Sequence, residues 1–206
     1  MEFLAQKHIH HGDLATRNIL LTDSLIAKIS DFGLSRRLYE DLSEPQPVLK
    51  PRPENNHQVA LPIKWLAPEV LMHHSIIPEK SDVWSYGVMA WEVFALGADP
   101  YRKGNYIEDV IIRYIEFSCD NRKVKRLLYY FYILLHVGIT LVELVSELEQ
   151  GIRLPKPYCC PNPISEIMSQ CFTANPSDRP SFVDVRCMIQ LAFNQLKEIP
   201  STSKSS

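Results

Sequence analysis

A chain of 206 residues with 46% hydrophobic and 22% charged residues is long enough to build one domain with a sizeable core. A formal net charge of −2 gives no reason to expect a nucleic acid partner. The five cysteines are irregularly spaced, which does not indicate a disulfide framework, and no Cys/His spacing resembles a zinc site. The composition therefore indicates an ordinary globular protein of a reducing compartment.

The first half of the chain predicts one helix and one hairpin before a long loop. The first eight residues are expected to be helical, and residues 19–21 and 25–29 are expected to pair as strands around a turn at 22–24. Residues 31–69 are expected to be mostly loop, because prolines interrupt regular structure at positions 45, 47, 51, 53 and 62.

From residue 81 onward the sequence predicts helices. Apolar residues crowd all sides of the first of them, as expected of a helix buried at the centre of the domain. Four helical segments are predicted: 81–96, 143–150, 163–173 and 181–197. The pattern thus predicts one mainly α domain over 1–198 and a disordered tail over 199–206.

Three polar side chains form the strongest candidate for chemistry. Asp13 and Asn18 lie five positions apart in His11-Gly12-Asp13-Leu14-Ala15-Thr16-Arg17-Asn18, and Asp31 opens Asp31-Phe32-Gly33 beyond the hairpin. One carboxylate can accept a proton while an amide oxygen and a second carboxylate hold Mg²⁺ on a phosphate chain. Taken singly, each aspartate is also compatible with an ordinary turn.

With these motifs the chain resembles the C-terminal lobe of a receptor tyrosine kinase, closest to the vascular endothelial and platelet-derived growth factor receptor group. Leu-Ala-Thr-Arg-Asn is close to the receptor-type Leu-Ala-Ala-Arg-Asn, whereas serine/threonine kinases place a lysine two residues after the catalytic aspartate. The other segments that carry the resemblance, in the family's order, are 61–69, 81–88, 91–97 and 175–182.

The resemblance implies a mainly α C-terminal lobe of the protein kinase-like fold, with a short β-hairpin at the catalytic loop and no N-terminal lobe. It implies transfer of the γ-phosphate of ATP to protein tyrosine with Mg²⁺, as part of a transmembrane receptor signalling pathway. Expected partners are tyrosine substrates and a receptor dimer partner. The expected location is the cytoplasmic face of the plasma membrane, with any anchor upstream of residue 1. The alternative is a non-catalytic pseudokinase or scaffold module.

The resemblance also implies roles for individual residues at the site of transfer. Asp13 matches the catalytic base, and Arg17 matches the arginine that neutralises the transferred phosphate. Asn18 and Asp31 match the Mg²⁺ ligands that bind the nucleotide, and Leu20 matches the floor of the adenine pocket. The local alternatives are a solvent-facing charge for Arg17 and a plain core position for Leu20.

Further matches concern the substrate and the scaffold of the site. Pro62 matches the platform for the flat phenol ring, although it could be a plain loop proline. The scaffold matches are a stacked column of two rings, a buried ion pair and an acid at a helix start that holds the catalytic loop: His11 with Phe32, Glu69 with Arg179, and Asp82.

The chain departs from the family pattern in its regulation. Gly12 stands where most members carry an arginine that pairs with a phosphorylated activation-loop tyrosine. Between Asp31 and Glu69 the only tyrosine is Tyr39, at the early position. We therefore expect no standard phosphotyrosine–arginine switch. Because ATP binds between two lobes, we also expect this chain alone neither to bind ATP tightly nor to phosphorylate.

Residues 109–142 do not fit the family pattern, which joins the flanking segments over roughly half the distance found here. This stretch is rich in Ile, Leu and Tyr and carries a basic patch at 122–126. One interpretation is an unspliced intron translated in frame, and the other is a genuine surface insertion.

Overall fold

The computed structural model of the protein describes residues 1–37, 61–77, 79–101 and 139–198. Most of residues 109–142, Tyr39 and the tail 199–206 lie outside these ranges, so the predictions on them stay predictions. The described α-helices are α1 (Glu2–Gln6), α2 (Pro68–His73), α3 (Lys80–Phe94), α6 (Leu141–Glu149), α7 (Asn162–Cys171) and α8 (Phe182–Glu198). Short 3-10 helices lie at Thr16–Asn18, Ile63–Trp65 and Pro176–Asp178.

The described strands form two small antiparallel ladders. β2 (Ile19–Leu21) pairs with β3 (Ala27–Ile29) in the predicted hairpin, with Ile19 opposite Ile29. β1 (Ile9–His10) pairs with β4 (Arg36–Arg37) in a ladder that the sequence did not predict. The prediction of a mainly α fold with a short hairpin at the catalytic loop is therefore confirmed.

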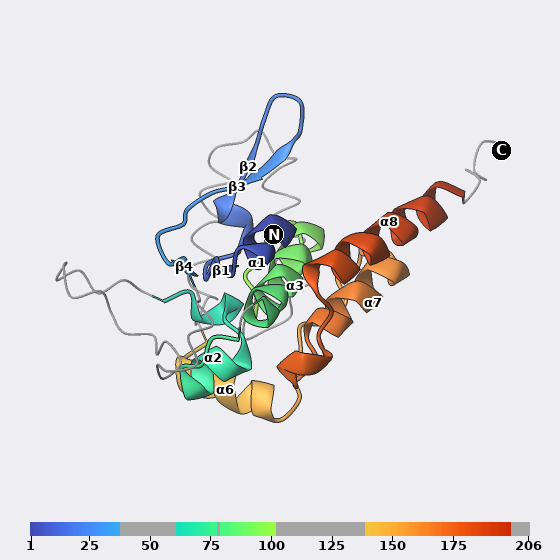
Figure 1. Ribbon diagram of the computed structural model, residues 1–206. Helices are drawn as coiled ribbons and strands as arrows, with labels where there is room; N and C mark the ends of the chain where they lie inside the picture. Colours follow the sequence, from blue (N-terminus) through green and yellow to red (C-terminus); the bar gives the residue numbers. More distant parts are fainter. Residues whose placement is uncertain (38–60, 78, 102–138, 199–206) are drawn as a thin grey trace, which may run out of the picture.

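Helix α3 is the centre of the domain, as its apolar sequence predicted. In Figure 1 it runs through the middle of the molecule, with α7 and α8 along one side, α2 and α6 below, and the β2–β3 hairpin rising above. Trp84, Val88 and Trp91 of α3 are buried in a core to which α2 and α6 also contribute. α3 and α7 approach closely at Gly87. A Cβ atom added to this residue would lie only 2.8 Å from Cβ of Cys171.

The ends of the other helices follow from local chemistry. α6 begins with a capping box, in which Thr140 and Glu143 each bond the other's backbone N–H. α2 begins with Pro68 in its first turn, where the missing N–H costs nothing. α2 has no counterpart among the predicted elements, although it carries Glu69.

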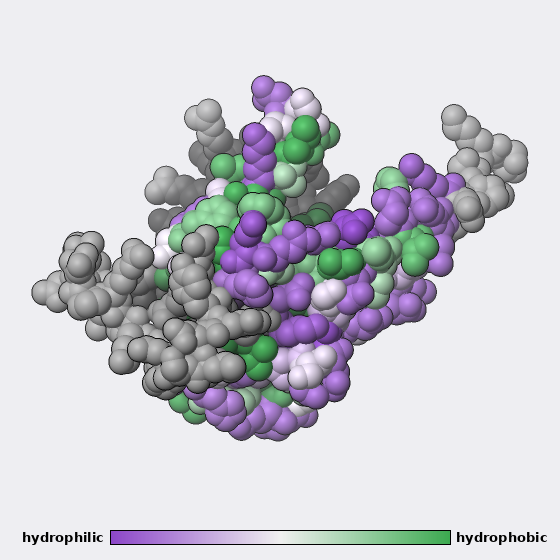
Figure 2. All heavy atoms as spheres, viewed as in Figure 1, coloured by the Kyte–Doolittle hydropathy of each residue, from purple (hydrophilic) through white to green (hydrophobic). Residues whose placement is uncertain are grey.

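The hairpin presents apolar side chains to solvent. Figure 2 shows apolar surface on the hairpin. The large apolar residues exposed there are Leu20, Leu21, Leu25 and Ile26. Within the described parts of the chain, no helix combines the length and the apolar character needed to cross a membrane.

Candidate active site

The catalytic-loop segment, residues 11–18, lies across α3 and is held by it from below. Asp82, near the start of α3, accepts the backbone N–H of His11 at 2.7 Å and that of Gly12 at 3.1 Å. Nδ1 of His10 lies 3.1 Å from Oδ1 of the same carboxylate. Burial by itself would raise the pKa of Asp82, but His10 and the two backbone N–H groups outweigh it and lower that pKa. Asp82 is thus a buried, charged anchor for the start of the loop.

Gly12 fits this anchored backbone. Its φ is +81°, in the left-handed region that favours glycine, and a Cβ there would lie 3.0 Å from the backbone oxygen of Leu34. An arginine at this position would strain the loop as it is folded here. The buried N–H of Gly12 donates to Asp82, which restrains the loop at this glycine.

The ring of His11 joins the loop to the segment that begins Asp-Phe-Gly. Nδ1 accepts the backbone N–H of Asp13 at 3.3 Å, so the proton lies on Nε2, which donates to the backbone oxygen of Ser30 at 3.2 Å. The rings of His11 and Phe32 are 4.9 Å apart between centroids. The structure therefore brings together the two rings of the expected column.

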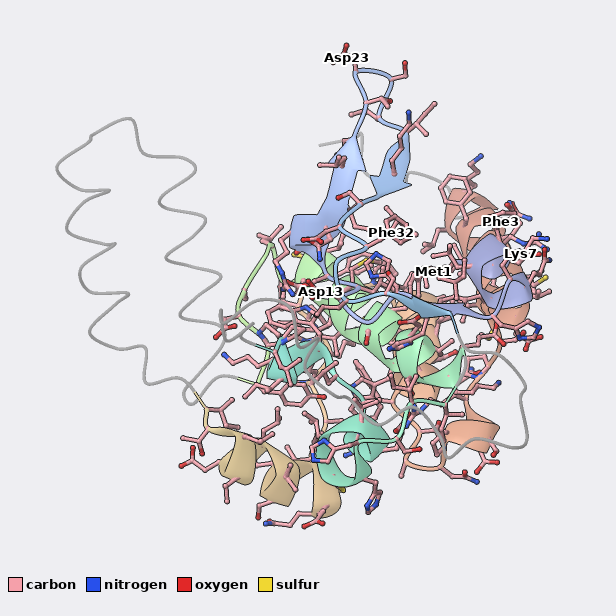
Figure 3. All side chains as sticks on the ribbon, turned by 60° about the vertical axis from the view of Figure 1, so that its left-hand side comes forward. Met1, Phe3, Lys7, Asp13, Asp23 and Phe32 are labelled. Atoms are coloured by element: carbon pink, nitrogen blue, oxygen red, sulfur yellow. The ribbon has the colours of Figure 1, made fainter. Side chains whose placement is uncertain are left out.

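The carboxylate of Asp13 is oriented by two donors from the next turn. Arg17 donates to Oδ1, and Nδ2 of Asn18 donates to Oδ2 at 2.8 Å and to the backbone oxygen of Asp13 at 2.7 Å. The guanidinium carbon of Arg17 also lies 4.3 Å from the ring centroid of Trp65. Figure 3 shows Asp13 beneath the base of the hairpin, whose far tip carries Asp23.

Asp13 and Asp31 face one pocket of about 450 Å³. The residues that line it are Asp13, Arg17, Asp31, Gly33, Leu34, Pro62 and Trp65. The pocket thus joins the catalytic loop, the Asp-Phe-Gly segment and the proline expected to support a phenol ring. Leu20, which was expected to floor an adenine pocket, does not line it and is 57% exposed on β2.

The oxygens beside this pocket are suited to Mg²⁺. Asn18 donates two hydrogen bonds through Nδ2. Its carbonyl oxygen Oδ1 has no donor among the described residues. Asp31 accepts the N–H of Gly33 with Oδ1, and its second oxygen has no described partner. The described residues contain no group of three or more His, Cys, Asp or Glu that could enclose a metal. Two hard oxygens suit a Mg²⁺ ion that keeps several waters and shares phosphate oxygens.

A buried ion pair lies below the pocket, at the start of α2. Nη1 and Nη2 of Arg179 donate to the two carboxylate oxygens of Glu69 at 2.8 and 2.9 Å. Ser81 donates to the same carboxylate at 2.8 Å, and Arg179 also bonds the backbone oxygen of Lys80 at 3.0 Å. The structure therefore brings together the two expected partners in a bidentate geometry.

Sequence reasoning missed two residues of this region, Trp65 and Glu92. Trp65 lines the pocket, and its Nε1 donates to Oε2 of Glu92 at 2.9 Å. Glu92 is 6% exposed near the end of α3. A signal was present in the sequence, since an acidic residue inside a helix predicted to be buried is seldom left unpaired.

Comparison with known proteins shows which sequences this chain is similar to. The family model described as protein tyrosine and serine/threonine kinase matches residues 1–189. Over 90% of its length the chain is 34% identical to the tyrosine-protein kinase receptor torso of Bombyx mori and 36% identical to the vascular endothelial growth factor receptor kdr-like of Danio rerio. It is 32% identical, over 90% of its length, to the tyrosine-protein kinase Srms of Homo sapiens. The chain spans 17%, 11% and 29% of these relatives, respectively.

Proposed function

The chain belongs to the protein tyrosine and serine/threonine kinase family, and from this premise we propose that it supplies the phosphotransfer half of a receptor tyrosine kinase. One observation carries the proposal. Asp13 and Asp31 line the same pocket, and Asn18 is hydrogen-bonded to Asp13. A proton acceptor and two candidate metal ligands therefore lie at one site.

In this proposal Asp13 is the catalytic base. Arg17 and Asn18 fix its carboxylate through one oxygen each, and each oxygen keeps a lone pair for a further donor. A tyrosine hydroxyl in the pocket would donate to this carboxylate and be oriented for in-line attack. Arg17 would lie beside the transferred phosphoryl group and offset part of its negative charge.

ATP supplies the phosphoryl group, and Mg²⁺ neutralises charge on its phosphates when bound. Oδ1 of Asn18 and the second oxygen of Asp31 would hold the metal. Pro62 lines the pocket beside Asp13 and offers an apolar surface on which a flat phenol ring can lie. This proximity favours tyrosine over the shorter serine and threonine.

We propose further that the chain by itself is inactive. Leu20, the apolar residue expected at the floor of the adenine pocket, is 57% exposed. An adenine ring bound there would have apolar contact on one face only, which gives little affinity. The exposed hairpin would pack against the remainder of a kinase domain, in a receptor at the cytoplasmic face of the plasma membrane. Its partners would be tyrosine substrates and a second receptor.

The test compares the 206-residue chain with a fusion protein that carries the upstream kinase lobe of the kdr-like receptor. The chain alone should give no MgATP-dependent phosphorylation of a tyrosine peptide, whereas the fusion should phosphorylate it. Asp13→Asn should remove that activity, and Asp23→Asn at the hairpin tip should leave it unchanged. A fusion that binds MgATP without transfer would support the scaffold alternative, and transfer by the chain alone would refute the proposed inactivity.

A further inference from the structure

Glu92 holds two separate segments of the site through one buried carboxylate. Oε2 accepts the backbone N–H of Thr16 at 3.0 Å and Nε1 of Trp65 at 2.9 Å. Oε1 accepts the hydroxyl of Thr16 at 2.9 Å. Three donors thus satisfy a buried charge that would otherwise be costly. Thr16 and Trp65 lie 76 and 27 residues before Glu92 in the sequence.

Helix α3 consequently holds the catalytic loop at two points. Asp82 binds the loop at His11 and Gly12, and Glu92 binds it at Thr16. The two residues are ten positions apart on the α-helix, which corresponds to about 15 Å along the axis. Asp13 lies between the two anchored points, so both anchors restrict where its carboxylate can go.

The same contacts close a ring around the pocket wall. Thr16 begins the 3-10 turn that contains Arg17, and the guanidinium of Arg17 lies over the ring of Trp65. Nε1 of Trp65 in turn donates a hydrogen bond to Glu92. Since Arg17 also donates to Asp13, a shift of Glu92 would move the base and the Pro62 segment together.

We propose that Glu92 is a positioning residue that sets the distance between the catalytic base and the substrate platform, and that Thr16 transmits its effect. The proposal rests on the proposed function. Thr16 donates its hydroxyl to Oε1, a bond that the alanine at this position in the receptor-type Leu-Ala-Ala-Arg-Asn could not form. Glu92 does not line the pocket, so it would act through Thr16 and Trp65 without touching substrate.

Fluorine NMR of the 206-residue chain labelled with 5-fluorotryptophan tests the coupling directly. The sequence has three tryptophans, and Trp84 and Trp91 serve as internal references. Thr16→Val should shift the Trp65 resonance, although no direct bond joins these two side chains among the described contacts. Thr16→Ser should restore it. Thr22→Val, the same change on the hairpin, should have no effect.

The Glu92→Gln variant decides whether the shift passes through Glu92. In this background Thr16→Val should no longer move the Trp65 resonance, and the amide of Thr16 should exchange at least about tenfold faster with solvent. A general loss of stability would instead shift all three tryptophan resonances. The coupling is refuted if Thr16→Val leaves the Trp65 resonance unchanged. It is also refuted if Thr16→Val shifts that resonance equally in the wild-type and Glu92→Gln backgrounds.

The fusion protein supplies the kinetic half of the test. Glu92→Gln should lower kcat for the tyrosine peptide at least about tenfold and leave the KM for ATP nearly unchanged, because geometry and not nucleotide affinity is altered. An unchanged kcat in an active fusion would overturn the positioning role. An inactive wild-type fusion that binds MgATP would count against the proposed function instead, while the fluorine experiment would still decide the coupling.

Discussion

Two regions of this domain use carboxylates in opposite ways. Below the catalytic loop, Glu69, Asp82 and Glu92 are buried, and each accepts at least two hydrogen bonds from other segments. In the pocket above, Asp13 is half-buried, and Asp31 is exposed with one backbone donor from its own turn. The lower carboxylates hold the fold together, whereas the upper ones keep lone pairs available for chemistry. Substitutions should therefore separate stability from chemistry according to region.

The largest loss of stability should come from the buried ion pair. Arg179→Ala leaves the carboxylate of Glu69 buried without its bidentate partner, and it should lower the free energy of unfolding by about 3–5 kcal/mol. Urea unfolding of the 206-residue chain measures this value. Arg186→Ala is the matched control, because its pair with Glu2 is exposed and its loss should leave the midpoint unchanged. Equal effects of the two variants would contradict the comparison.

A smaller loss is expected where α3 meets α7. Gly87→Ala would place a methyl group 2.8 Å from Cβ of Cys171 and 2.9 Å from the ring of Phe172. Such overpacking should cost about 1–3 kcal/mol in urea unfolding. Ser169→Ala, on an exposed position of α7, serves as the control. A stability equal to wild type would show that the two helices separate more readily than this packing implies.

Asp82 should give a loss that depends on pH. Its pKa is lowered in the folded state, so its contribution to stability is present above 3.8 and is lost as the pH falls through the lowered value. At pH 7 Asp82→Asn should cost about 1–3 kcal/mol, because the new amide opposes a backbone donor. The difference from wild type should shrink in acid, as measured by urea unfolding from pH 7 to pH 3. A constant difference would argue against a charged Asp82.

The smallest effect on stability is expected in the pocket. Asp31→Asn should leave the free energy of unfolding within about 0.5 kcal/mol of wild type, because that side chain is exposed and accepts one local bond. Thermal unfolding of Asp31→Asn and of Asp82→Asn, each against wild type, measures the difference in stability between the two variants. A loss for Asp31→Asn as large as that for Asp82→Asn would erase the distinction between the two regions.

The sequence predicted the elements whose patterns are local. The apolar crowding of α3, the β2–β3 hairpin and the helices near residues 163–173 and 181–197 all have counterparts in the structure. Helix α2 escaped prediction because six residues give too short a pattern. The β1–β4 ladder escaped because it pairs Ile9 with Arg37, far along the chain.

In the candidate site, too, residues in a local motif could be predicted, whereas contacts between distant residues could not. Asp13, Asn18 and Asp31 could be found because their spacing is a motif, and the receptor tyrosine kinase resemblance drawn from it is confirmed by comparison. Glu92 could not be assigned a partner, since its donors Thr16 and Trp65 are 76 and 27 residues away. Local patterns predict that a buried charge needs partners, but only the tertiary structure names them.

The most direct test of the account is a Mn²⁺ titration of the ¹⁵N-labelled chain, with Mn²⁺ as a paramagnetic substitute for Mg²⁺. Amides of residues 13–18 and 31–34 should broaden together and before those of α6, which also carries an exposed acidic residue, Glu149. Asp31→Asn should weaken the broadening in both segments. Broadening that spares 31–34, or that is unaffected by Asp31→Asn, would contradict a shared metal position between the two loops.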